Sequence, residues 1–335
     1  MLKKFLLMVL VLAVNTCSAQ NDSIFIASWN VENLFDTIDN PNTNDEEFTP
    51  SGAKEWTLER YNRKIENLSK VLSEMNSNNG PDNLGQVEIE NKSVVEDLAA
   101  KASFKAYSVV HFESPDFRGI DNALLYDNKK FDFISANTYK VILDSNKTTR
   151  DILRVSLKNK NDGEIFNFFV NHWPSRRGGL ADSEANRISA AEVLKSAVDS
   201  LYSVNENSNI IIMGDFNDET DNRSISEILQ SKNFKCDDDQ SDKYLLNTSA
   251  QRDELGEGTY LYQKNWNMLD QIIISKSLDD NKGWEYKCDS FDIFKKDYMI
   301  TKEGYFKGAI IPSYGGRKYL DGYSDHYPVT ITLIK

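Results

Sequence analysis

The stretch that decides the fold is residues 209–218, NIIIMGDFND, in which four apolar residues lead directly into a carboxylate and an amide. A short apolar run bounded by turn residues predicts a strand that is buried on both faces. Side chains two positions apart on a strand point to the same side, so Asp215 and Asn217 are expected to face the same way at its end. Taken alone, the same residues are better explained as a turn that only ends a strand.

Apolar patterns on either side of this strand predict a layered fold. Apolar residues recur at helical spacing over 61–75 and over 185–201, so a helix is expected in each span. A short strand is expected to end near Glu88, and further strands are expected over 23–30, 123–126, 131–134, 152–157, 164–171, 269–274 and 329–334. Their pairing is expected to be mainly antiparallel. Strands mixed with a few long helices predict an α/β fold of two packed sheets with helices outside.

The sequence predicts a single domain because it contains no segment typical of a domain linker. No linker rich in Pro, Gly or Ser divides it, so residues 20–335 are predicted to form one domain, with 221–256 as an excursion of helix or loop. The polar stretch 36–56 is expected to be a long loop. Because long loops on rigid scaffolds carry recognition, this loop is the first candidate for a specificity element.

Residues 1–19 are predicted to be an export signal. Two lysines precede an apolar run of ten residues, and small residues precede the expected cleavage after Ala19. The run is too short to span a membrane, and no comparable run follows, so no integral membrane segment is expected. The protein is therefore expected to be periplasmic or secreted, and a lipid anchor on Cys17 is the less favoured alternative. Export would leave Cys236 and Cys288 in an oxidising compartment, where a disulfide and two separate buried thiols are both open.

Composition and charge exclude several classes of protein. An aromatic content of 11% and a hydrophobic content of 40% are enough for a packed core, so general disorder is excluded. The formal charge is −13, and loss of Lys3 and Lys4 with the signal would make it −15. This charge argues against a protein that coats nucleic acid with a broad basic surface. It does not exclude an enzyme that binds one phosphate locally.

The chain has only three histidines, which limits the candidates for proton transfer near neutral pH. His172 follows an expected strand and precedes a basic turn that contains Arg176 and Arg177. His326 follows Asp325 at the start of the last expected strand. His111 follows two valines and is interpreted as a histidine of the core or its rim.

Six motifs resemble those of the endonuclease/exonuclease/phosphatase superfamily, and they occur in the same order. They are SWNVENLF at 28–35, GQVEIEN at 85–91, NHWPSR at 171–176, GDFND at 214–218, LDQIIIS at 269–275 and SDHYPV at 324–329. Each motif is weak by itself, but six in order are specific. The resemblance extends over essentially the whole mature chain. It implies the deoxyribonuclease-I-like fold, a four-layer α/β sandwich with the active site at one edge of the paired sheets.

The resemblance also implies the role of each site residue. Glu88 is the expected principal metal ligand, with Asn30 and Asp325 beside it and Glu90 as an additional candidate. Asp215 and Asn217 would hold the attacking water, the phosphate or a second metal. His326 would be the general base, Asp270 would orient it, and His172 would bond a phosphate oxygen or protonate the leaving group. Arg118 resembles the phosphate-side arginine of the family.

This assortment suits metal-assisted hydrolysis of a phosphate ester. Attack of water on a phosphodiester requires that the negative charge developing on the phosphate be neutralised, and a divalent metal ion can do this. Mg²⁺ is expected, with Mn²⁺ or Ca²⁺ as alternatives, because these ions prefer oxygen ligands. The attack also needs a base, and imidazole has an ordinary pKa of ~6.5. Arg118, Arg176 and Arg177 are predicted to bind substrate phosphate. An exposed basic turn is an equal interpretation of the adjacent pair.

The leading hypothesis is an exported Mg²⁺-dependent phosphodiesterase that cuts nucleic acid, with DNA preferred. The alternative is a phosphatase or phospholipase-type hydrolase acting on inositol phosphates or sphingomyelin, because the superfamily uses one metal site for all of these. A binding module without turnover is less favoured, since every expected ligand is present. A monomer is the favoured oligomeric state. Whether cleavage is internal or from an end, and whether one or two metals act, both stay open.

Overall fold

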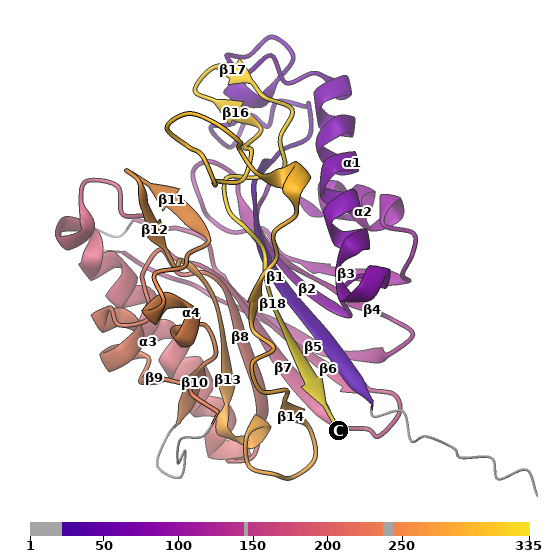
Figure 1. Cartoon of the computed structure of the whole chain (residues 1–335), viewed down its shortest axis with the longest axis vertical. Helices are drawn as coiled ribbons and strands as arrows, with labels where there is room; N and C mark the ends of the chain where they lie inside the picture. Colours follow the sequence, from indigo (N-terminus) through magenta and orange to yellow (C-terminus); the bar gives the residue numbers. More distant parts are fainter. Residues whose placement is uncertain (1–21, 144–146, 237–243) are drawn as a thin grey trace, which may run out of the picture.

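The computed structural model describes residues 22–143, 147–236 and 244–335. The predicted export signal and Cys17 therefore lie outside the described residues. Two sheets pack face to face, and helices cover their outer faces (Figure 1). None of the helices in the described ranges has the length and apolar character needed to cross a bilayer.

The first sheet has seven strands, with β15 beside β18 at one end. In spatial order they are β14 (Glu285–Tyr286) and β15 (Asp292–Ile293) on β18 (Val329–Ile334), then β1 (Ser23–Leu34), β2 (Asn83–Ile89), β4 (Asp121–Asp127) and β3 (Tyr107–His111). The helices α1 (Leu58–Glu74) and α2 (Lys92–Lys101) lie on its outer side (Figure 1). The Thr57 side chain caps α1 by accepting a hydrogen bond from the Arg60 amide.

The second sheet also has seven strands. In order they are β5 (Phe131–Tyr139), β6 (Ile152–Asn159), β7 (Ile165–His172), β8 (Asn209–Asp215), β13 (Asp270–Ser275), β10 (Leu245–Asn247) and β9 (Ser231–Asn233). The long helix α3 (Leu180–Val204) lies on its outer side (Figure 1), and the π-helix η4 (Ser224–Ile228) contacts α3. Small elements complete the chain: η1 (Glu46–Phe48), η2 (Asn76–Asn78), α4 (Ala250–Glu254), β11 (Tyr260–Tyr262), β12 (Asn265–Asn267), η5 (Lys276–Leu278), η6 (Asp297–Met299), β16 (Tyr314–Gly315) and β17 (Lys318–Tyr319).

The strand β8 shows why the second sheet is buried on both faces. Ile211 and Met213 belong to the core between the two sheets, whereas Ile210 and Ile212 belong to the core under α3. Alternation along a strand sends successive side chains to opposite faces, so a strand with an apolar layer on each side must be apolar throughout. This explains the unbroken apolar run from which the fold was predicted.

The predicted α/β sandwich is confirmed, and its pairing is mainly antiparallel. Three pairs are parallel: β1 with β2, β7 with β8, and β9 with β10. The expectation that 221–256 is an excursion was incomplete, because β9 and β10 extend the second sheet from within it. These strands have three residues each, too short for an alternating pattern to reveal them. No sequence pattern predicted α2, β3 or the two small hairpins, β11–β12 and β16–β17.

The two cysteines of the described residues form a disulfide. Cys236 and Cys288 are joined across 52 positions of sequence. The bridge ties the segment after β9 to the segment after β14. Of the two alternatives left open by the sequence, the disulfide is therefore the one observed.

Candidate active site

The predicted site residues converge on one cleft. They come from the end of the sheets where β2, β7 and β8 end and β18 begins (Figure 1). The cleft has a volume of about 870 Å³. The site residues predicted from the sequence that line it are Glu88, Arg118, His172, Arg176, Arg177, Asp215, Asn217, Asp325 and His326. Asn30 and Asp270 lie behind this lining, each bonded to one of its members. The fold therefore brings together residues from both sheets.

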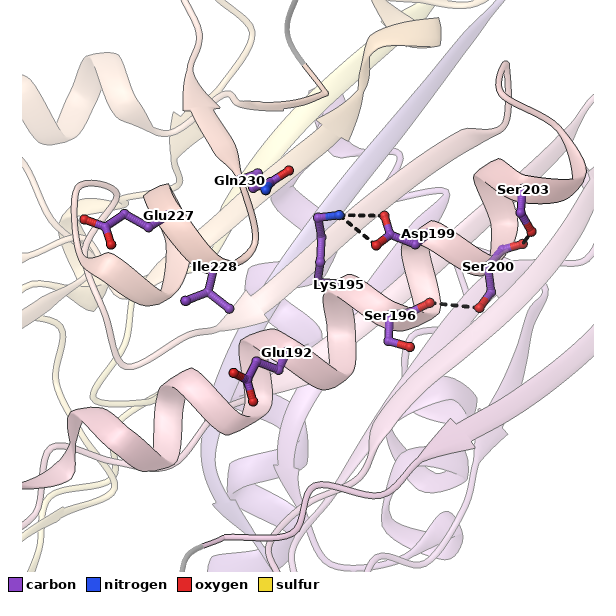
Figure 2. Close-up of a pocket in the computed structure, with 9 residues that line it drawn as sticks. All are labelled: Glu192, Lys195, Ser196, Asp199, Ser200, Ser203, Glu227, Ile228 and Gln230. Atoms are coloured by element: carbon purple, nitrogen blue, oxygen red, sulfur yellow. Dashed lines mark hydrogen bonds and ion pairs between the residues drawn. The ribbon is translucent and has the colours of Figure 1, made fainter.

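A second hollow, between α3 and η4, contains none of these residues (Figure 2). The Lys195 ammonium is held there by both carboxylate oxygens of Asp199, at 2.6 and 2.7 Å. Its other charged lining groups are the carboxylates of Glu192 and Glu227. A hollow whose cation is already paired and whose other charges are negative is poorly suited to a phosphate.

Asp215 is fixed at the end of β8 by the close approach of β7. A Cβ atom on Gly214 would lie 1.9 Å from the Asn171 carbonyl oxygen, and Gly214 has a φ of +140°, so only glycine fits there. The Asp215 Oδ1 atom accepts a hydrogen bond from the Asn217 amide at 2.8 Å, and Oδ2 accepts one from Asn30 Nδ2 at 3.1 Å. Both carboxylate oxygens are therefore oriented by the protein.

Asn217 reaches the cleft by a turn and not by continued strand geometry. Its φ is +50°, in the left-handed region, so the alternation of β8 ends at Asp215. Its side chain donates from Nδ2 to the Trp173 carbonyl oxygen at 3.1 Å. Asp215 and Asn217 do meet in one cleft, as expected, but a two-residue strand period does not explain it.

His326 and Asp270 form a buried pair. His326 Nδ1 lies 2.7 Å from Asp270 Oδ2, and the Thr259 hydroxyl donates to the same oxygen at 2.6 Å. The Ser324 hydroxyl accepts a hydrogen bond from the His326 amide at 3.1 Å. With Nδ1 engaged by a carboxylate, the other ring nitrogen, Nε2, is directed toward Asp215, 3.9 Å from its Oδ2 atom.

The charges of the cleft act strongly on these groups. Burial alone would lower the pKa of His326, but the carboxylates of Asp270, Asp215 and Asp325 outweigh it and hold that pKa well above 6.5. Burial raises the pKa of Asp215 to about 6 and that of Asp325 to about 7. Carboxyl groups with raised pKa values, packed around a histidine in a cleft, are typical of functional sites.

The donors present fit a hard divalent cation. Glu88 and Asp325 both line the cleft, and the charge of Glu88 contributes to the raised pKa of Asp325. Asp325 Oδ1 is buried and has no hydrogen-bond partner among the described residues. A buried carboxylate oxygen without a partner is costly, and a cation is the natural partner for an oxygen in an acidic cluster.

Glu88 and Asn30 are held in place by backbone amides. Glu88 has a φ of +62°, and its Oε2 atom accepts a hydrogen bond from the Asn33 amide at 3.1 Å. Asn30 Oδ1 accepts one from the Glu32 amide at 3.0 Å. Left-handed backbone at non-glycine residues is strained, and such strain collects at sites where geometry matters. Glu90 instead accepts a hydrogen bond from the Asp36 amide and does not line the cleft.

His172 lies between two carboxylates but forms a hydrogen bond with neither. Its Nε2 atom is 3.8 Å from Glu88 Oε1 and 3.7 Å from Asp215 Oδ2. Burial, with the nearby cations of Arg150 and Arg118, lowers the pKa of His172 well below 6.5. His172 is therefore neutral near pH 7 and carries one N–H donor.

The three arginines predicted to bind phosphate differ in how exposed their side chains are and in how many hydrogen bonds their guanidinium groups already form. Arg176 donates from Nε to the Asn217 carbonyl oxygen at 2.7 Å and from Nη1 to Asn267 Oδ1 at 2.9 Å, and its Nη2 atom contacts Asn222 and Glu219. Its guanidinium thus supports the loop that carries Asn217. Arg177 is exposed, and the side chain of Arg118 is 36% exposed, with both lining the cleft.

Residues that the sequence did not predict also line the cleft, among them Arg150 and Tyr260. Arg150 is buried, and it donates to Asp116 Oδ2 at 3.1 Å and to the Trp173 carbonyl oxygen at 2.6 Å. Tyr260 stacks on the His326 ring, with centroids 4.6 Å apart. Neither lies within one of the six motifs, so only the fold shows that they belong to the site.

An α/β sandwich with an acidic, histidine-containing cleft at one end of its sheets defines a protein of the deoxyribonuclease-I-like class. A model of the Endonuclease/Exonuclease/phosphatase family matches residues 25–335, and the chain belongs to this family. No curated protein matches the chain. Phosphoric ester hydrolysis is the activity that the family name describes.

Solved structures with low sequence identity share the fold. A family protein from Bacteroides thetaiotaomicron has a TM-score of 0.58 at 16% identity, covering 94% of this chain and 98% of that one. D. rerio TDP2 complexed with a single-strand DNA product has a TM-score of 0.57 at 15% identity, covering 93% and 98%. The mannosyl-6-phosphatase Bt3783 of Bacteroides thetaiotaomicron VPI-5482 has a TM-score of 0.56 at 15% identity, covering 93% and 100%. At these identities the likeness shows the fold alone.

Proposed function

We propose that this protein is an exported, Mg²⁺-dependent phosphodiesterase that hydrolyses nucleic acid, with DNA as the preferred substrate. The observation that carries the proposal is the orientation of His326. Its Nδ1 atom is held by Asp270, while its Nε2 atom is directed toward Asp215 in the cleft. A base with one fixed nitrogen and one nitrogen facing the substrate space is the arrangement required to activate a water molecule.

In this proposal His326 accepts the proton of the attacking water at Nε2. Asp270 stabilises the imidazolium that forms and keeps the ring in the correct orientation. Asp215, whose two oxygens are fixed by Asn217 and Asn30, lies across from Nε2 and can orient the water. A positioned base of this kind contributes about 10² to 10⁴ in rate.

Glu88 and Asp325, with Asn30 beside them, would hold the divalent ion. When bound, the ion supplies positive charge to the phosphate oxygens as negative charge develops there. His172 is neutral, so its role is to donate a hydrogen bond to a phosphate oxygen and not to release a proton. Arg177 is exposed on the lining of the cleft, and Arg118, whose Nε atom lies 3.6 Å from Asp116 Oδ1, also offers guanidinium donors there.

Export is supported by the disulfide between Cys236 and Cys288. Disulfides form and persist in oxidising compartments and are rare in the cytosol. The N-terminal signal pattern and the disulfide are independent observations, and both favour a protein that acts outside the cytoplasm.

The proposal is tested by a panel of substrates with the full mature chain. Plasmid DNA, RNA, sphingomyelin, inositol phosphates and a sugar phosphate are incubated in parallel with Mg²⁺, and duplicates contain a chelator. We expect hydrolysis of DNA, weaker hydrolysis of RNA, and none with chelator. Turnover confined to the lipid, the inositol phosphates or the sugar phosphate would overturn the nucleic-acid assignment.

A further inference from the structure

The β11–β12 hairpin extends a stack of aromatic rings outward from His326. Tyr260 stacks on the His326 ring at a centroid distance of 4.6 Å and an interplanar angle of 25°. Tyr262 is two positions further along β11, and its ring is tilted by only 12° from that of Tyr260, with centroids 6.5 Å apart. Alternate residues of a strand point to one side, which explains why the two tyrosine rings are nearly parallel.

The outer end of this stack is available to a ligand. Both tyrosines line the cleft, and Tyr262 is 56% exposed. A large aromatic side chain left half-exposed at the mouth of a cleft is a typical recognition element. On the same lining, Phe117 is 63% exposed and lies next to Arg118. The mouth of the cleft therefore presents aromatic surface together with cations.

The hairpin is held firmly against the catalytic residues. Asn267 of β12 accepts a hydrogen bond from Arg176 Nη1 at 2.9 Å, and its carbonyl oxygen accepts one from the Thr259 amide at 2.9 Å. The Thr259 hydroxyl bonds to Asp270, the partner of His326. A ring that docks on Tyr262 would therefore lie at a fixed position relative to the general base, without the entropic cost of ordering a loop.

Building on the proposed function, we propose that Tyr260 and Tyr262 stack an unpaired nucleobase next to the phosphate that is cleaved. The preferred substrate is then single-stranded nucleic acid or a frayed end. Every base has a π-face, so stacking on aromatic residues binds single strands without sequence preference. In a duplex both faces of a base are covered by its neighbours. The chain also has a formal charge of −13, which disfavours binding along a duplex backbone.

The test compares three DNA substrates of one sequence: a single strand, the same strand fully annealed, and a single strand with abasic nucleotides. kcat/KM is measured for the wild type and for Tyr262→Ala and Tyr262→Phe. Phe133→Ala is the matched control, because Phe133 is 49% exposed on β5 and does not line the cleft. Base stacking is worth about 1–3 kcal/mol, which corresponds to about 5- to 150-fold in binding.

We expect the wild type to favour the base-bearing single strand over both other substrates by about tenfold or more. Tyr262→Ala should lower kcat/KM on that strand by about tenfold and leave the abasic strand unaffected, whereas Tyr262→Phe and Phe133→Ala should stay within about twofold. Equal losses on base-bearing and abasic strands, or no loss on either, would overturn the stacking proposal while leaving the nuclease assignment intact. Absence of any hydrolysis of nucleic acid would overturn both.

Discussion

Two histidine–aspartate pairs in this molecule have nearly the same geometry and different surroundings. His326 lies 2.7 Å from Asp270, and His111 lies 3.0 Å from Asp121. All four side chains are buried. The second nitrogen of His326 is directed toward Asp215 in the cleft, whereas that of His111 lies 4.0 Å from the exposed carboxylate of Glu113.

The difference shows that a buried histidine–carboxylate pair does not by itself define an active site. Asp121 Oδ1 also accepts a hydrogen bond from the Ser114 amide at 2.7 Å, so the His111 pair ties β3 to the start of β4 and to the loop between them. That pair stabilises the fold. What makes His326 a candidate base is the cleft with Glu88, Asp215 and Asp325 around its free nitrogen.

The largest expected effect is on turnover. His326→Ala should lower kcat by about 10² to 10⁴, because the general base is lost, while Mg²⁺ affinity changes little. kcat is measured on the best DNA substrate, and Mg²⁺ affinity by calorimetry. The control is His111→Ala, which should keep kcat within about threefold. Unchanged kcat in His326→Ala, or an equal loss in both variants, would contradict the distinction between the two pairs.

A second pair of variants tests whether the carboxylates of the cleft, and not the carboxylate near His111, determine the Mg²⁺ requirement. Glu88→Gln removes a carboxylate from the expected cation site, so the Mg²⁺ concentration for half-maximal activity should rise by about tenfold or more. Glu113→Gln removes a 72% exposed carboxylate beside His111 and should leave that concentration unchanged. A titration of activity with Mg²⁺ measures both. The same Mg²⁺ requirement in Glu88→Gln would show that this carboxylate does not bind the ion.

The pH dependence of turnover should report the His326 pair and not the His111 pair. The base acts when deprotonated, so kcat/KM should rise as the pH increases through the His326 pKa, which lies above 6.5. Asp270→Asn removes the carboxylate that contributes most to raising this pKa, so the rising limb should move to lower pH while the plateau falls. Asp121→Asn should leave the limb in place. A profile of Asp270→Asn that does not move, or moves to higher pH, would argue against His326 as the titrating base.

The smallest effect on activity, with a measurable effect on stability, is expected at His111. His111→Ala leaves the buried Asp121 carboxylate without its side-chain partner, which should cost about 1–3 kcal/mol in the free energy of unfolding. Urea denaturation measures this cost. Glu113→Gln, at an exposed position, should stay within about 0.5 kcal/mol of the wild type. Wild-type stability in His111→Ala would show that this pair is not structural.

Local patterns predicted the long elements of the fold. The apolar run at 210–213 predicted β8, and helical spacing predicted α1 and α3, because burial on a fixed face leaves a period in the sequence. Short elements such as β9 and β10 have no room for a period. They become strands only by pairing within the sheet, β10 on the edge of β13 and β9 on β10.

The adjacent arginines show where sequence reasoning stops. The sequence suggests the same phosphate-binding role for Arg176 and Arg177. In the structure, Arg176 is hydrogen-bonded to Asn217 and Asn267, whereas Arg177 is exposed on the cleft. Nothing local distinguishes them, because the partners of Arg176 lie 41 and 91 positions away. Arg150 and Tyr260 were missed for the same reason, since their role depends on contacts with distant residues.

The sequence by itself determined the α/β class, the long strands and helices, and the set of carboxylates and histidines, because burial periods and motif order are written along the chain. Only the tertiary structure decided that Cys236 bonds Cys288 and that His326 rather than His111 faces a cleft. It also decided that the rings of Tyr260 and Tyr262 continue outward from the His326 ring. These features depend on distances between residues far apart in sequence, and such distances are set when the sheets pack, not by local propensity.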